Sequence, residues 1–185
     1  MKLISIILFT LCLTTTLFAQ GEDDDSSNLK TTFGIKAGYN AIQMKVESET
    51  NNNIQKEAGV YFGAFVNIPT SETFSVQPEV LYSSSRYNIN DNINLLHVPV
   101  SLKFNLTNNF TGFFGPEAQF LLGIGDEDTS LFNDVMFGFY FGANYEVAPN
   151  FFLEARPYFA ISKILDDSGV TRKLNTLQVG LAYQF

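Results

Sequence analysis

The residue best suited to chemistry in this 185-residue chain is its only histidine, His97. Imidazole transfers protons near neutral pH, and in a serine-based catalytic site it must hydrogen-bond to the serine. Ser101 lies four residues further along the same predicted strand, about 13 Å away at the rise of an extended chain. That distance is too long for a hydrogen bond, so the sequence does not pair His97 with Ser101.

A second group of reactive side chains consists of charged residues that fall on the polar side of alternating segments. Buried charges are costly unless they pair with opposite charges or stay hydrated. If the segments close into a barrel, these residues share its interior, and we expect an ionic network that fills it. A hydrated ion path is the alternative. The residues are Lys36, Glu79, Lys103, Glu117, Glu146, Glu154 and Arg156.

The composition excludes several other functions. The formal net charge of −8 disfavours nucleic acid, because its phosphates would repel the protein. Asp126, Glu127 and Asp128 lack the spaced ligands and the glycine of a calcium loop. The only cysteine, Cys12, lies in a segment that we expect to be removed. We therefore expect no metal, no cofactor and no nucleic-acid partner.

Residues 1–19 have the pattern of a secretory signal peptide. Lys2 precedes an apolar run that ends at Phe18, and the small residue Ala19 follows. The run is too short and too rich in threonine to span a bilayer. We predict cleavage between Ala19 and Gln20, which leaves residues 20–30 as a flexible acidic leader in the periplasm.

The rest of the chain, residues 31–185, is organised like its last stretch. There, odd positions are apolar or aromatic and even positions are small or polar, which is the period of a strand with one apolar face. Such alternation over about ten residues is what a strand of a transmembrane barrel requires. We count about eight such segments. In the last one, the apolar set is Leu177, Val179, Leu181, Tyr183 and Phe185.

The connections between the segments alternate in length. Long polar stretches at 44–56, 86–94, 125–134 and 166–173 alternate with short turns near 69–72, 106–109 and 148–150. Outer-membrane barrels have short periplasmic turns and longer external loops. The sequence therefore predicts an all-β fold, a membrane-spanning antiparallel up-and-down β-barrel of about eight strands. Pro78 cannot donate to the hydrogen-bond ladder, so we expect a bulge there.

Several stretches resemble a known family. They are Val76 to Tyr82, Leu96 to Lys103, Phe114 to Ala118 and the terminal Tyr-Gln-Phe. The chain is similar in these stretches to eight-stranded outer-membrane β-barrel proteins of the PorT-like, OmpX-like and OmpA-barrel-like kind. The resemblance implies the outer membrane of a Gram-negative bacterium. It also implies that the barrel-assembly machinery reads the terminal strand through Phe185 and Tyr183.

These observations favour a non-enzymatic scaffold in the cell outer membrane, with extracellular loops and a non-conducting interior. Its expected partners are outer-membrane lipid and lipopolysaccharide, which basic loop residues would contact, and a protein bound at the loops or periplasmic turns. One alternative is a soluble calycin-like barrel that binds an apolar ligand. A lipid-modifying outer-membrane enzyme and a small ion channel also stay open.

The signal-peptide prediction is tested by the mass of the protein extracted from membranes. We expect a chain that begins at Gln20, because Ala19 ends the apolar segment and has the small side chain that cleavage requires. A mature chain that retains residues 3–18 would contradict the predicted compartment.

Overall fold

The computed structural model describes residues 29–48, 52–86, 91–125, 133–162, 165–167 and 170–185. In this part of the chain, nine strands form one sheet. Their bounds are β1 Thr32–Ser48, β2 Asn52–Pro69, β3 Phe74–Arg86, β4 Asn92–Asn105, β5 Phe110–Ile124, β6 Val135–Ala148, β7 Phe151–Ala160, β8 Leu165–Asp167 and β9 Val170–Gln184.

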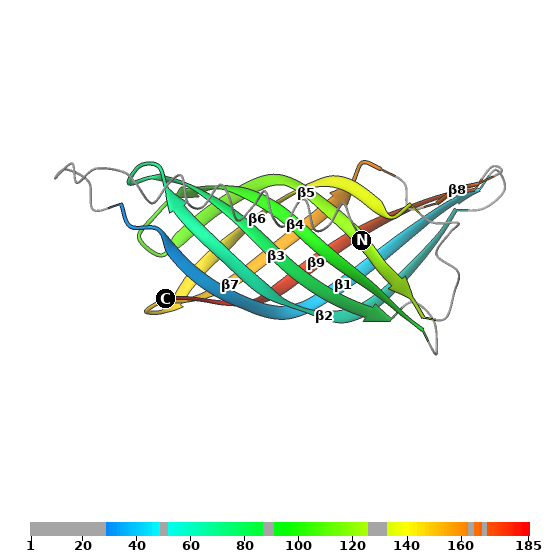
Figure 1. Cartoon of the computed structure of the whole chain (residues 1–185), viewed down its shortest axis with the longest axis horizontal. Helices are drawn as coiled ribbons and strands as arrows, with labels where there is room; N and C mark the ends of the chain where they lie inside the picture. The colour runs from blue at the N-terminus through cyan, green and yellow to red at the C-terminus, as the bar shows by residue number, and fades with distance from the viewer. Residues whose placement is uncertain (1–28, 49–51, 87–90, 126–132, 163–164, 168–169) are drawn as a thin grey trace, which may run out of the picture.

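The sheet closes on itself into an up-and-down barrel (Figure 1). Strands β1 to β7 pair in sequence order, β9 follows β7, and β9 pairs back with β1. All of these pairings are antiparallel, and the short β8 pairs only with β9 among the described strands. The predicted fold is therefore confirmed, with eight long strands in the wall.

The described residues include no helix that is long and apolar enough to cross a membrane.

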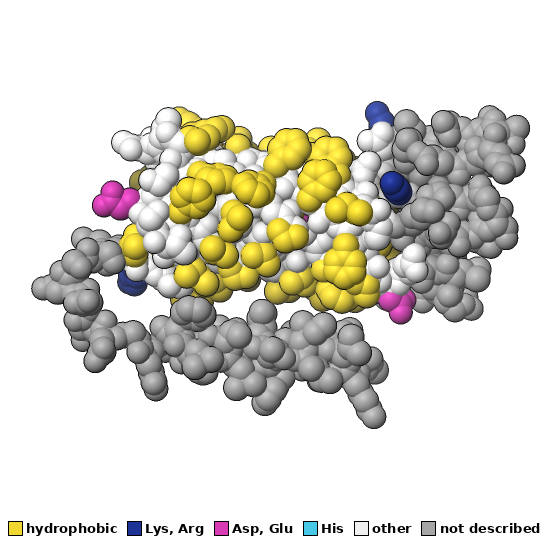
Figure 2. Space-filling view, turned by 90° about the horizontal axis from the view of Figure 1, so that it is seen from above, with side chains coloured by type: hydrophobic (Ala, Val, Ile, Leu, Met, Phe, Trp, Pro, Cys, Tyr) yellow, Lys and Arg dark blue, Asp and Glu magenta, His cyan; other side chains and the backbone are white. Residues whose placement is uncertain are grey.

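The alternating side chains face as the sequence predicts. On β6, Phe137, Phe139 and Phe141 are exposed, whereas Gly138 and Tyr140 face the interior and are buried. The same alternation on the other long strands covers the outside of the barrel with apolar side chains. Figure 2 shows this apolar belt across the middle of the molecule, with charged side chains near its two ends. Such a belt is suited to the hydrocarbon core of a bilayer.

The two ends of the barrel differ. At one end, which we call the short-turn end, residues 70–73, 106–109 and 149–150 connect neighbouring strands. Asn150 has a positive φ of 67°, which asparagine tolerates in a tight turn. Aromatic rings line the outside here: Phe104 packs against Phe74 and Phe114, and Tyr183 packs against Phe151 and Phe185. We call the opposite end the loop end.

Strands at the loop end are longer than predicted, and the expected 44–56 loop is wrong for most of its length. The ladder between β1 and β2 continues as far as the pair Glu47 and Asn52. Likewise β8 pairs with β9 where a 166–173 loop was expected: Asp167 pairs with Val170, and Leu165 pairs with Arg172. A hydrogen-bond ladder does not need apolar side chains, so polar composition did not mark where the strands end.

The expected bulge at Pro78 is also wrong. The register between β2 and β3 is the same on both sides of Pro78, although the ladder lacks pairs at Val66 and Asn67. Register shifts occur instead between Asn94 and Leu95 in β4 and near Glu146 in β6. The wall thus accommodates proline by an interruption of the ladder rather than by an extra residue.

Some predictions concern residues outside the described part of the chain. These are the signal peptide 1–19, with the cleavage site at Ala19 and Gln20, residues 20–28 of the leader, and Asp126, Glu127 and Asp128.

The position of Phe185 gives a matched test of the terminal recognition element. Phe185 and Phe33 are both exposed, by 68% and 59%, and the Phe185 backbone N–H donates to Phe33 O at 2.8 Å. Deleting Phe185 should reduce the amount of assembled protein more than Phe33→Ala does, because both changes remove a lipid contact but only the first removes the proposed recognition residue. The measurement is heat-modifiable migration on unboiled gels. Equal yields would mean that Phe185 is an ordinary interfacial aromatic.

Candidate functional site: the barrel lumen

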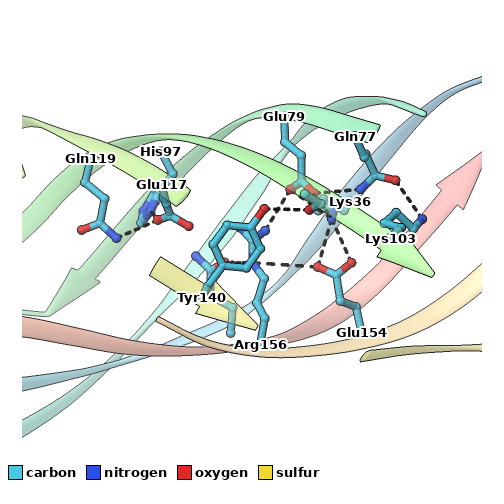
Figure 3. Close-up of polar contacts among 12 residues, drawn as sticks. Lys36, Gln77, Glu79, His97, Lys103, Glu117, Gln119, Tyr140, Glu154 and Arg156 are labelled. Carbon is cyan, nitrogen blue, oxygen red and sulfur yellow. Dashed lines mark hydrogen bonds and ion pairs between the residues drawn. The ribbon is translucent and has the colours of Figure 1, made fainter. Parts of the chain in front are cut away.

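Four charged side chains meet inside the barrel near the short-turn end. Lys36 Nζ on β1 lies 3.1 Å from Glu79 Oε2 on β3 and 2.9 Å from Glu154 Oε2 on β7. Arg156, also on β7, places Nη1 2.9 Å from the same Glu79 oxygen. None of the four residues is more than 3% exposed. We call them the ionic cluster; Figure 3 shows them converging across the lumen from strands that are not neighbours.

Uncharged polar side chains add hydrogen bonds to this cluster, although Arg156 Nη2 is buried without a hydrogen-bond partner. Gln77 Nε2 and Ser101 Oγ donate to Glu79 Oε1 at 2.7 and 3.3 Å. Arg156 Nε donates to Gln178 Oε1 at 2.6 Å. Sequence reasoning did not select Gln77 or Gln178, although both lie at inward positions of the alternating pattern. That pattern is the signal that would have found them.

Aromatic faces cover both cations. Lys36 Nζ lies 5.2 Å from the centroid of the Phe65 ring, and Arg156 Cζ lies 5.1 Å from that of Tyr140. A desolvated cation over a ring face gains an electrostatic attraction of about 2 kcal/mol. The Tyr140 hydroxyl is also 2.7 Å from Ser101 Oγ, which ties the ring to the polar network.

His97 belongs to a second polar group, further from the short-turn end. Its Nε2 is 2.7 Å from Ser83 Oγ, and its Nδ1 is 2.7 Å from Glu117 Oε1. Gln119 Nε2 donates to the same Glu117 oxygen at 2.7 Å. We call Ser83, His97, Glu117 and Gln119 the His97 group. It draws on β3, β4 and β5, which are consecutive neighbours in the wall.

The spacing of Ser83, His97 and Glu117 is that of a serine nucleophile, its base and an orienting acid. Acyl transfer also requires a carbonyl substrate at the serine and free donors for the oxyanion. Ser83 and His97 are fully buried, and the backbone around Ser83 is paired with β2 on one side and β4 on the other. Sequence reasoning missed Ser83, because only the register between strands places it beside His97.

The charged residues of the predicted interior network are distributed over three places. Lys36, Glu79, Glu154 and Arg156 form the ionic cluster, and Glu117 joins the His97 group. Lys103 is connected through Gln77, whose Oε1 accepts from Lys103 Nζ at 2.9 Å.

Glu146 does not lie with the others, which corrects the prediction. Its carboxylate accepts a hydrogen bond from the backbone N–H of Asn150 at 3.2 Å, in the exposed turn after β6. Glu146 has the parity of an inward residue, but it is only half-buried and lies two residues before the end of β6.

The described residues contain no group of three or more histidine, cysteine, aspartate or glutamate side chains that could hold a metal ion.

Comparison with solved structures supports the fold. Ail, the attachment invasion locus protein of Yersinia pestis, is 16% identical with a TM-score of 0.52, covering 85% of this chain and 100% of that one. The backbone structure of Yersinia pestis Ail in a phospholipid bilayer nanodisc is 15% identical with a TM-score of 0.50, and the match covers 84% of this chain and 100% of that one. Neisserial surface protein A is 15% identical with a TM-score of 0.49, and the match covers 84% of this chain and 99% of that one. At these identities the likeness concerns the fold alone. No curated protein matches the chain.

The family comparison is more informative. Residues 18–166 match the family described as outer membrane protein beta-barrel domain, which covers most of the alternating strands and the whole ionic cluster. The expected PorT-like branch within such barrels stays a prediction. The chain belongs to the outer membrane protein beta-barrel domain family and is an outer-membrane β-barrel protein.

Proposed function

We propose that this protein is a non-conducting, non-enzymatic scaffold that presents an extended sheet at the loop end to a partner outside the cell. The observation that carries the proposal is that β1, β2 and β9 continue beyond the barrel wall. Residues 52–58 of β2 pair with β1, whereas the described part of the β2–β3 ladder begins at Gly59 and Ser85. Figure 1 shows these strands projecting at one end.

Along the barrel axis, the apolar belt ends where the extension begins, the extension being the parts of β1, β2 and β9 that continue beyond the barrel wall. Ala41 on β1 pairs with Leu177 on β9 and with Ala58 on β2. Among the side chains that the structure describes, the exposed large apolar residues of β1 and β9 lie at this level or on its short-turn side. Beyond it, β1 runs on to Ser48, roughly 20 Å at the rise of a strand. An extended sheet that a rigid wall holds in water is a surface to which an extended segment of another protein can add.

The polar contents of the lumen support the non-conducting part of the proposal. The ionic cluster joins β1, β3 and β7 across the interior with ion pairs near 3 Å. Eight strands enclose a space that side chains can fill. The ionic cluster in the lumen also disfavours the alternative of a soluble barrel for an apolar ligand, because most phenylalanine side chains are exposed on the outside of the barrel.

The proposed lipid contacts follow from the same arrangement. The apolar belt contacts the lipid chains, and exposed basic residues at its loop-end margin, including Lys56 and Arg86, contact the phosphates of lipopolysaccharide. Figure 2 shows Lys or Arg side chains at that margin.

Arg156 tests whether the lumen is dry. Replacing it by methionine leaves Glu79 and Glu154 with one cation, Lys36, and should lower the free energy of unfolding by ~3 kcal/mol if the cluster is dehydrated. A hydrated lumen would limit the loss to less than about 1 kcal/mol. The measurement is urea unfolding in lipid vesicles.

The matched control is Glu146→Gln, which removes a half-buried charge at the end of β6, outside the ionic cluster, and should change stability by less than about 1 kcal/mol. A second measurement, single-channel recording of the wild type in planar bilayers, tests whether the lumen conducts ions. Steady open-channel conductance together with an unchanged midpoint for Arg156→Met would overturn the non-conducting lumen.

The proposed orientation is tested by single cysteines, since the barrel domain contains none. Lys56→Cys in the extension and Thr70→Cys in a short turn both replace exposed residues. An impermeant maleimide should label the first in intact cells and the second only after the outer membrane is permeabilised. The reverse pattern would place the extended sheet in the periplasm and contradict the proposal.

A further inference from the structure

The lumen near the loop end contains an aliphatic cluster where the alternating pattern of a polar-lined barrel predicts polar side chains. Its members come from β1, β4, β5, β6 and β9, and each is at most 4% exposed. Leu121 packs against them. The cluster consists of Ile42, Ile93, Leu95, Ile124, Met136 and Leu174.

The cluster lies on the loop-end side of both polar groups. On β4, Leu95 is the next inward residue after His97 in the loop-end direction. On β9, Leu174 lies two inward positions beyond Gln178, the residue that accepts from Arg156. Ile93 pairs with Ile124 across β4 and β5, beyond the register shift at Leu95. Along the axis the order is therefore ionic cluster, His97 group, aliphatic cluster.

The ionic cluster and the aliphatic cluster would block ions by different physical means. An ion pair can take up water when one partner swings away, and charged side chains can then solvate a passing ion. Aliphatic side chains offer neither hydrogen bonds nor charge, so water leaves a narrow passage between them and an ion would have to give up its hydration.

We propose that the barrel is closed by two seals in series, the ionic cluster toward the short-turn end and the aliphatic cluster toward the loop end, and that either alone prevents conduction. This inference rests on the proposed non-conducting function. It assigns the aliphatic cluster a role separate from packing: the ionic cluster can rearrange and hydrate while the lumen stays closed to the side of the extended sheet.

Paired substitutions separate the two seals. Glu79→Ala/Arg156→Ala removes both members of one ion pair and leaves the 2.9 Å pair between Lys36 and Glu154. Leu95→Ser/Leu174→Ser makes the aliphatic cluster smaller and polar. Each two-site variant should be as silent as the wild type in planar bilayers, and the four-site variant should show stepwise conductance.

The matched control adds Leu81→Ser to Glu79→Ala/Arg156→Ala. Leu81 is as fully buried in the lumen as Leu95, but it lies outside the aliphatic cluster. We expect this three-site variant to stay silent. Heat-modifiable migration verifies that each variant is assembled. If the four-site protein does not assemble, Leu95→Ser alone in the Glu79→Ala/Arg156→Ala background replaces it, with the same expected result.

The outcomes distinguish the inference from the function on which it rests. Conductance by the wild type would overturn the proposed non-conducting function. A silent wild type with a conducting Glu79→Ala/Arg156→Ala variant would leave that function intact and overturn the second seal. The second seal would also be overturned if the four-site variant assembles and does not conduct. The same holds if the Leu81 control conducts as much as the four-site variant.

Discussion

The shared carboxylate of Glu79 is the interaction on which the lumen depends. It accepts from Lys36 and Arg156, two cations on strands that only β9 separates in the wall, and from Gln77 and Ser101. These partners lie on β1, β7, β3 and β4. Because the side-chain period of a strand is two, a slip of one residue would turn a charged partner toward lipid. The ion pairs therefore specify strand register as well as filling space.

The alternating pattern was sufficient to predict which side chains face lipid and which face the lumen. It correctly turned Phe139 outward and Lys36 inward because facing is a local property of a strand. It failed where the answer depends on neighbouring strands or on strand ends. Predicting the Ser83 to His97 contact requires the β3–β4 register, and predicting that Glu146 bonds to Asn150 requires knowledge of the turn.

The aliphatic cluster was missed for a related reason. Ile93 and Leu95 stand within or beside an asparagine-rich stretch, which composition assigned to a loop. Ile42 and Leu174 lie next to other stretches that were assigned to loops. These residues share a core only after β1, β4 and β9 extend past the apolar belt. The lumen therefore has an aliphatic core at the loop end and polar side chains below it.

The seam between β1 and β9 also determines when the barrel can form. It joins Gly34 to Gln184, which are separated by nearly the whole barrel domain, and the last backbone N–H of the chain donates to Phe33 O. Contacts so distant in sequence cannot form while the chain is still emerging from the ribosome or crossing the inner membrane. Throughout that interval one edge of β1 lacks its β9 partner, and an unpaired strand edge tends to pair with other chains.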